Sequence, residues 1–255
     1  MIFLKSSQEI ELMRTANRMV SEILAELRER VIPGISTGEL DRVAAELIRK
    51  KGAHSAFKGY RMRNGSVPFP ATICISLNDE VVHGIPSFQR LIREGDIVSL
   101  DFGVIYRDFY GDAAVSFAVG EVEQPVCRLL ETAAAALEAG IAEARVGNRL
   151  GNISAAIQER VEQEGFSVVR EFVGHGVGRR LHEDPPVPNY GMRDRGVRLR
   201  EGLVLAIEPM VNAGRAEVAL KSDGWTAVTK DSSLSAHFEH SVAITEKGPD
   251  VLSRL

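Results

Sequence analysis

The chain has 255 residues, of which 44% are hydrophobic and 26% are charged. This ordinary globular composition excludes a disordered chain, a collagen and a membrane bundle. The 31 Lys and Arg residues against 35 Asp and Glu residues leave a net charge of −4, which excludes a globally basic nucleic-acid binder. Two cysteines, Cys74 and Cys127, are too few for a disulfide framework or a four-cysteine zinc site. Since neither a secretion signal nor a long apolar run is found, we expect a cytoplasmic protein without a membrane segment.

The first fifty residues predict two helices. Apolar residues recur at spacings of three and four over residues 8–30, with charged residues between them, and a Pro-Gly pair then ends the pattern. Ser36 and Glu39 have the spacing of a capping box. They predict a second helix that runs to about Lys51.

Helices and strands then follow in an order that repeats. After a polar, turn-rich loop, runs rich in β-branched residues predict strands of the first half at 71–77, 97–104 and 113–119. The second half has two predicted helices and four predicted strands, at 122–145, 148–164, 167–173, 203–211, 225–230 and 239–245. This repetition predicts a single α+β domain over residues 1–255, with pseudo-repeats at about 8–120 and 121–248.

Four carboxylates stand at the ends of predicted strands, where acidic residues are disfavoured: Asp101, Asp112, Glu208 and Glu239. Because strand side chains alternate, each acid shares its face with small residues, while bulky apolar residues occupy the opposite face. We expect the apolar face to pack against helices and the acidic face to form the floor of a cleft. Taken singly, each acid is also explained as a strand end that faces water. Four carboxylates close together must keep their protons or bind cations, so the pattern predicts two divalent metal ions.

His175 is the candidate nitrogen ligand of this site. It stands between glycines in Gly174-His175-Gly176, which would allow unusual backbone dihedrals and close approach. A neutral histidine beside carboxylates suits Zn, Mn, Fe or Co. His83 and His182 have sequence settings that suggest chemistry, although a surface loop would explain either one alone.

The remaining histidines give weaker signals. His54 and His237 are interpreted as structural residues. His240 neighbours Glu239, but strand alternation places it on the opposite face of the sheet.

The ordered set of Asp101, Asp112, His175, Glu208 and Glu239 resembles the five metal ligands of type I methionine aminopeptidases. The surrounding sequence is also similar, at Val81-Val82-His83-Gly84-Ile85-Pro86, Gly174-His175-Gly176-Val177-Gly178, Ile207-Glu208-Pro209-Met210 and Phe238-Glu239-His240. The likeness covers nearly the whole chain. It implies the pita-bread fold, an α+β fold with two pseudo-symmetric halves around a mainly antiparallel sheet, and two divalent metal ions per chain (Co, Mn, Fe or Zn).

The resemblance implies a role for each ligand. Asp101 resembles the bidentate ligand of one metal, and Asp112 and Glu239 resemble the bridging carboxylates. His175 and Glu208 resemble ligands of the other metal.

The resemblance also implies catalytic and substrate-binding residues. His182 resembles the histidine that contacts the scissile carbonyl, and His83 resembles the histidine that lines the substrate site. Glu208 would move a proton to the leaving amine. The methionine pocket would be lined by Tyr60, Phe69, Cys74, His83 and Trp225.

Two departures from the compact bacterial form concern this pocket. Residues 61–66 resemble an insertion close to Tyr60. Leu181 stands where that form usually has an aromatic residue, which would loosen side-chain selectivity.

The implied function is removal of the initiator methionine from nascent proteins and peptides with a small second residue, by water that the paired metals activate. We expect a monomeric, cytoplasmic enzyme whose partners are nascent polypeptide N-termini and, transiently, the ribosome, without direct nucleic-acid readout. One alternative is a proline-specific relative (a prolidase or aminopeptidase P), although those usually carry an additional amino-terminal domain. The other is a non-catalytic pita-bread binding protein, although such proteins usually lack ligands and all five are present here.

Overall fold

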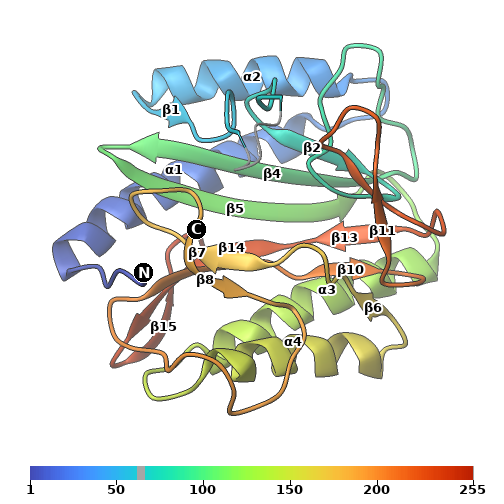
Figure 1. Ribbon diagram of the computed structural model, residues 1–255. Helices are drawn as coiled ribbons and strands as arrows, with labels where there is room; N and C mark the ends of the chain where they lie inside the picture. The colour runs from blue at the N-terminus through green and yellow to red at the C-terminus, as the bar shows by residue number, and fades with distance from the viewer. Residues whose placement is uncertain (62–66, 255) are drawn as a thin grey trace.

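The computed structural model describes residues 1–61 and 67–254 of the chain. In this part of the chain four long helices form two pairs, and both pairs cover the same apolar face of a curved sheet, each against one half of it (Figure 1). The first pair consists of α1 (Ser7–Arg30) and α2 (Thr37–Lys50), and the second of α3 (Gln124–Glu143) and α4 (Leu150–Gln163). All four match helices predicted from the sequence. None of the described helices is both long and apolar enough to span a membrane.

The predicted capping box begins α2. The Ser36 hydroxyl accepts the Glu39 N–H at 3.2 Å, and the Glu39 carboxylate accepts the Ser36 N–H at 3.0 Å. Both groups therefore satisfy backbone N–H donors that the first helical turn leaves unpaired. Ser6 and Glu9 form the same motif at the start of α1.

The largest sheet is antiparallel and joins the two halves of the chain. Seven of its strands follow one another in space as β1 (His54–Ser55), β4 (Ile97–Tyr106), β5 (Phe109–Ala118), β14 (Glu239–Thr245), β9 (Val204–Ile207), β7 (Gly174–Gly176) and β8 (Glu183–Val187). In addition, β2 (Cys74–Leu77) pairs with β4, and β15 (Gly248–Val251) pairs with β14. The halves meet where β5 pairs with β14.

Two three-stranded sheets complete the described fold. One has the order β13 (Ser235–His237), β10 (Met210–Asn212), β6 (Ser167–Val168). The other has the order β11 (Val218–Leu220), β12 (Ala227–Thr229), β3 (Glu80–Val82).

The two faces of the large sheet differ as the alternation predicted. Bulky side chains of β4 and β5 pack against α1 and α2 in one core, and those of β9 and β14 pack against α3 and α4 in another. The predicted outer-face residues in these cores are Val98, Leu100, Phe102, Phe117, Leu205, Ile207, Val242 and Ile244. Each such side chain contributes about 1.5–3 kcal/mol when fully buried. The helices therefore hold the sheet from its apolar side and leave the small-residue face for the carboxylates.

Several strand boundaries differ from the prediction. The strand predicted at 113–119 begins earlier, at Phe109, because Arg107 and Asp108 make a tight turn with φ of 47° and 66°. This two-residue hairpin turn lacks glycine, so the usual turn signals do not reveal it. The strand predicted at 203–211 is interrupted at Pro209 and contributes to two different sheets.

The strands predicted at 71–77, 167–173 and 225–230 are shorter than expected. Strand β2 begins only at Cys74, β6 contains two residues, and β12 contains three. Neighbouring apolar residues such as Ile73, Val169 and Trp225 are buried without belonging to a strand. A short buried apolar segment has the same sequence pattern as a buried strand.

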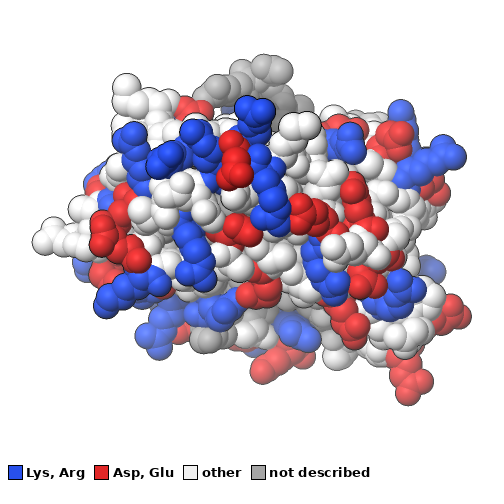
Figure 2. Space-filling view, turned by 90° about the horizontal axis from the view of Figure 1, so that it is seen from below, with Lys and Arg blue, Asp and Glu red and all other residues white. Residues whose placement is uncertain are grey.

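Oppositely charged side chains share the surface of the second helix pair. Figure 2 shows Lys and Arg lying among Asp and Glu on the face seen from below. Ion pairs such as Arg160–Glu164 and Arg193–Glu159 connect them. Exposed pairs of this kind contribute only about 0–1 kcal/mol each.

Helix α1 is fixed directly to the strand that carries Asp112. A Cβ on Gly111 would lie 2.7 Å from the backbone nitrogen of Asn17, so helix and strand approach as only glycine allows. The fully buried Asn17 side chain accepts the Asp112 N–H at 3.1 Å and donates to the Met13 carbonyl at 2.9 Å. These bonds transmit the position of the helix to the carboxylate strand.

We predict that Asn17→Ala destabilises the protein by about 1–3 kcal/mol, because the buried Asp112 N–H then has no acceptor. Urea unfolding would measure this difference. The matched control is Arg18→Ala on the exposed side of the same helix, where the expected change is within about 0.5 kcal/mol. Equal effects of the two substitutions would contradict the anchoring role of Asn17.

Candidate metal centre

Two neighbouring rows of cross-strand partners bring the five predicted ligands together. In the first row, Asp101 of β4 and Glu239 of β14 both pair with Ala114 of β5. Ile207, the last residue of β9, pairs with His240. Glu208 comes next along the chain, so it stands opposite Glu239 and extends the row. Residues that are directly opposite in an antiparallel sheet share a face, so these three carboxylates point the same way over a small alanine.

The second row contributes the other two ligands. His175 of β7 and Ser241 of β14 both pair with Ala206 of β9. The Ser241 hydroxyl donates to the backbone carbonyl of Asp112 at 2.9 Å, so that Asp112 of β5 ends this row. Ala206 and Ser241 are small, which leaves space above them for the ligand side chains.

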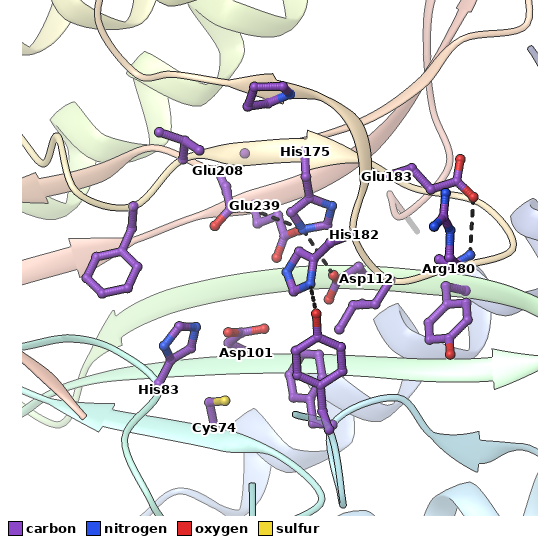
Figure 3. A pocket seen from close by; sticks show the side chains of 18 of the residues that line it. Cys74, His83, Asp101, Asp112, His175, Arg180, His182, Glu183, Glu208 and Glu239 are labelled. Carbon is purple, nitrogen blue, oxygen red and sulfur yellow. Dashed lines mark hydrogen bonds and ion pairs between the residues drawn. The ribbon is translucent and has the colours of Figure 1, made fainter. Parts of the chain in front are cut away.

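The side chains converge on one point above the sheet (Figure 3). Ligand atoms of Asp112, His175 and Glu239 all lie within 4.8 Å of one another. The His175 Nε2 atom lies 3.4 Å from Glu208 Oε1 and 3.8 Å from Asp112 Oδ2. Asp101 and Glu208 line the same cavity.

The donor set fits a divalent cation. Among the described residues, Asp112 Oδ1 and Glu239 Oε1 are buried without a hydrogen-bond partner. Buried carboxylate oxygens are costly unless something compensates them. Carboxylate oxygens together with an imidazole nitrogen suit Zn, Mn, Fe or Co, so the residues present can hold metal.

Burial raises the pKa of all four carboxyl groups. It raises the pKa of Asp101 to about 7 and that of Glu208 to about 8. The pKa values of Asp112 and Glu239 are raised well above the ordinary range, first by burial and then by the neighbouring carboxylates. Burial also lowers the pKa of His175 to about 3 and so keeps its imidazole neutral. The site thus retains protons near neutral pH that a cation would displace.

The glycines beside His175 allow close packing of three strands. A Cβ on Gly174 would lie 2.4 Å from the Ala206 carbonyl oxygen, and one on Gly176 would lie 2.3 Å from that of Asp184. The close approach of the strands that the two glycines were expected to allow is therefore confirmed. The unusual backbone dihedrals expected there are not found, because neither glycine has a positive φ angle. His175 itself lies within β7, just after the strand predicted at 167–173.

His83 reaches the cavity from a strained backbone position. Its φ is 61°, which non-glycine residues seldom adopt and which often marks functional sites. The ring makes edge contacts with Phe172 and Trp225, at centroid distances of 5.5 and 6.0 Å. Burial lowers the pKa of His83 to about 4, so the ring is neutral at pH 7.

His182 lies beside His175, with 4.3 Å between the ring centroids. Its Nδ1 atom is 2.5 Å from the Tyr60 hydroxyl. Burial lowers the pKa of His182 to about 4, so this imidazole is also neutral at pH 7. The structure thus brings both predicted catalytic histidines to the carboxylate cluster.

A cavity of about 750 Å³ lies over the carboxylates. The five residues predicted for the methionine pocket all line it: Tyr60, Phe69, Cys74, His83 and Trp225. Leu181 joins the apolar cluster formed by Phe69, Cys74 and Trp225. Trp225 Nε1 donates to the Val67 carbonyl at 2.9 Å, which closes this wall. Of the predicted insertion at 61–66, residues 62–66 lie outside the described residues.

His237, interpreted from the sequence as structural, lies behind Glu208. It is 2% exposed, and its Nε2 atom lies 3.6 Å from Glu208 Oε2 with no hydrogen bond to a described residue. The Ser116 hydroxyl fixes its backbone by bonding both its N–H and its carbonyl. Alternation could have indicated this placement, because His237 stands two residues before Glu239.

The other two histidines stay away from the cluster. His54 lies in β1 and is exposed. His240 forms a hydrogen bond with the Ser253 hydroxyl at 2.8 Å and lines a separate, smaller cavity. This agrees with the prediction that its side chain lies on the sheet face opposite that of Glu239.

Comparisons with known proteins agree with this arrangement. Residues 11–246 match the model of metallopeptidase family M24. Methionine aminopeptidase 1 of Bacillus subtilis is 50% identical over 255 residues, which cover all of both chains. The crystal structure of methionine aminopeptidase from Thermotoga maritima superposes with a TM-score of 0.96, at 46% identity and complete coverage of both chains.

A more distant likeness shows the fold alone. The prolidase from Pyrococcus horikoshii has a TM-score of 0.76 at 22% identity, over 98% of this chain and 63% of that chain. The predicted pita-bread fold is confirmed by the superposition on methionine aminopeptidase structures, from Thermotoga maritima and from Rickettsia prowazekii (TM-score 0.95, 36% identity, complete coverage of both chains). The chain belongs to metallopeptidase family M24, and within that family to the type I methionine aminopeptidases.

Proposed function

We propose that this protein removes the N-terminal initiator methionine from nascent proteins and peptides whose second residue is small. The observation that carries the proposal is the convergence of five ligand-type side chains on the floor of an apolar-walled cavity. The full-length likeness to methionine aminopeptidases supports this substrate. The likeness to the prolidase concerns the fold only and does not favour a proline-specific enzyme. The presence of all five ligand-type residues argues against a non-catalytic binding protein.

We propose that two divalent ions (Co, Mn, Fe or Zn) occupy the site. Asp101, Asp112 and Glu239 would hold one ion, and Asp112 and Glu239 would also reach the second, together with His175 and Glu208. When bound, such ions lower the pKa of a water molecule and polarise a substrate carbonyl.

The chain's own residues would perform the remaining steps. His182 is neutral and faces the cavity, so it can donate a hydrogen bond to the carbonyl oxygen of the first peptide bond. The Glu208 carboxylate lines the cavity and would receive a proton and deliver it to the leaving amine. His83 and the apolar wall around Trp225 would enclose the methionine side chain.

We place this activity in the cytoplasm, in a monomer that meets nascent polypeptide N-termini transiently at the ribosome. The net charge of −4 and the mixed charges of the face seen in Figure 2 support a partner that is bound through its polypeptide, without direct nucleic-acid readout and without a membrane.

We expect Glu208→Gln to lower kcat by about 100-fold or more, since the amide can neither accept nor deliver the proton. The thermal midpoint of the metal-free protein should change little, because burial already keeps most of the Glu208 carboxyl protonated near pH 7. Release of methionine from Met-Ala-Ser measures the first effect and calorimetry the second. The exposed Glu246→Gln serves as the control. Turnover of Glu208→Gln at the wild-type rate would remove Glu208 from the mechanism.

The proposed specificity predicts rapid cleavage of Met-Ala-Ser and at least about 10-fold slower cleavage of Met-Leu-Ser, because a large second residue must fit beside the carboxylates. Ala-Pro-Ser tests the proline-specific alternative and should remain intact. Comparison of kcat/KM for the three peptides distinguishes the methionine-specific activity from the proline-specific alternative. Equal rates for the two methionine peptides, or preferred cleavage of Ala-Pro-Ser, would be incompatible with the proposed substrate.

Metal uptake should release protons and should tighten as the pH rises from about 6 to 8. The reason is that Asp101 and Glu208, with pKa values of about 7 and 8, lose their protons in this window. Titration calorimetry with Mn²⁺ in two buffers of different ionisation enthalpy would measure about one proton or more per protein near pH 7. Binding without proton release and without pH dependence would contradict the assigned ligands.

A further inference from the structure

We propose that Tyr60 is a positioning residue: its hydroxyl donates to His182 Nδ1 and thereby holds the neutral imidazole in the tautomer that carries its proton on Nε2. The inference deepens the proposed function and rests on it, since it concerns the group that would face the scissile carbonyl. It assigns the tyrosine hydroxyl a task beyond lining the methionine pocket.

The contact between these residues is a direct hydrogen bond. The Tyr60 hydroxyl lies 2.5 Å from His182 Nδ1, and the two rings meet edge to face, with 5.2 Å between their centroids at 63°. Figure 3 shows the His182 ring beside His175, with the dashed line to the tyrosine hydroxyl on its other side. A neutral imidazole has one donor and one acceptor nitrogen. If the hydroxyl donates to Nδ1, the ring proton must therefore reside on Nε2.

Tyr60 is held in place by backbone hydrogen bonds to Phe57 and Phe69. Its N–H donates to the Phe57 carbonyl at 2.8 Å, and its own carbonyl accepts the Phe69 N–H at 2.9 Å. Gly59 N–H donates to the Phe69 carbonyl at 2.8 Å, which completes the pair. The backbone at Tyr60 is thus fixed by hydrogen bonds to described residues on both sides of it.

The backbone of His182 is held in place through its neighbour Glu183. The carboxylate of Glu183 accepts the N–H groups of Arg179 and Arg180 at 2.9 and 3.2 Å. It also forms an ion pair with Lys5 at 2.8 Å, in which both side chains are at most 4% exposed. Glu183 further pairs with Gly176, the neighbour of His175. The His182 backbone is thus fixed relative to the carboxylate cluster.

The tautomer matters because a carbonyl oxygen is only an acceptor of hydrogen bonds. An imidazole with its proton on Nε2 offers a donor to the cavity, whereas the opposite tautomer offers a lone pair that repels the oxygen. The developing negative charge on that oxygen strengthens the bond in the transition state. Fixing the proton in advance therefore lowers the barrier more than it improves substrate binding.

The first test reads the tautomer directly. The full-length protein, labelled with ¹⁵N in histidine and loaded with diamagnetic Zn²⁺, is studied by long-range proton–nitrogen correlation, with His182→Gln used for assignment. The wild type should show His182 protonated on Nε2. In Tyr60→Phe the two nitrogen shifts should move toward each other, as in a mixture of tautomers. Tyr110→Phe removes another tyrosine hydroxyl from the same cavity and should leave the pattern unchanged.

The second test separates positioning from packing. Tyr60→Phe keeps the ring, so KM for Met-Ala-Ser should stay within about twofold while kcat falls about 3- to 30-fold. A wild-type His182 protonated on Nδ1, or a Tyr60→Phe protein with the wild-type tautomer, would overturn the inference. An inactive wild type with the proton on Nε2 would contradict the proposed function but still support the hydrogen bond. The two failures are therefore distinguishable.

Discussion

The structure depends on four carboxyl groups that lie close together on a largely buried sheet face. Buried like charges repel, and each carboxylate has lost most of its hydration. The raised pKa values of Asp101, Asp112, Glu208 and Glu239 express this cost. Only bound protons or bound cations can compensate it. A fold that maintains such a cluster therefore either retains protons there or binds cations, and membership of a metallopeptidase family favours cations.

The rest of the architecture makes this cluster possible. Strand pairing across β4, β5, β14, β9 and β7 sets the spacing of the ligands, and small residues such as Ala114 and Ala206 keep space above the sheet. The helices bury the opposite face, so the energy that stabilises the fold comes from the side that carries no ligand. Asn17 connects the two sides through its bond to the Asp112 backbone.

The sequence predicts much of this arrangement, because periodicity and capping are local. The helices follow from apolar spacing of three and four and from capping residues. The two-faced sheet and the ligand set follow from alternation in segments such as 97–104 and 239–245, together with the family resemblance. The turn at Arg107 and Asp108 was not predicted, since its positive φ values occur without glycine. The bond between Tyr60 and His182 joins residues 122 positions apart, and no local pattern encodes such a contact. Alternation from Glu239 indicates the face on which His237 lies, whereas its contact with Glu208 depends on the tertiary fold.

We propose that five side chains from both halves of the chain hold a pair of divalent ions. Anomalous diffraction from crystals of the Mn²⁺-loaded protein tests this most directly. Two peaks are expected within coordination distance of Asp101, Asp112, His175, Glu208 and Glu239. Peaks elsewhere on the protein, with none at these five residues, would contradict it.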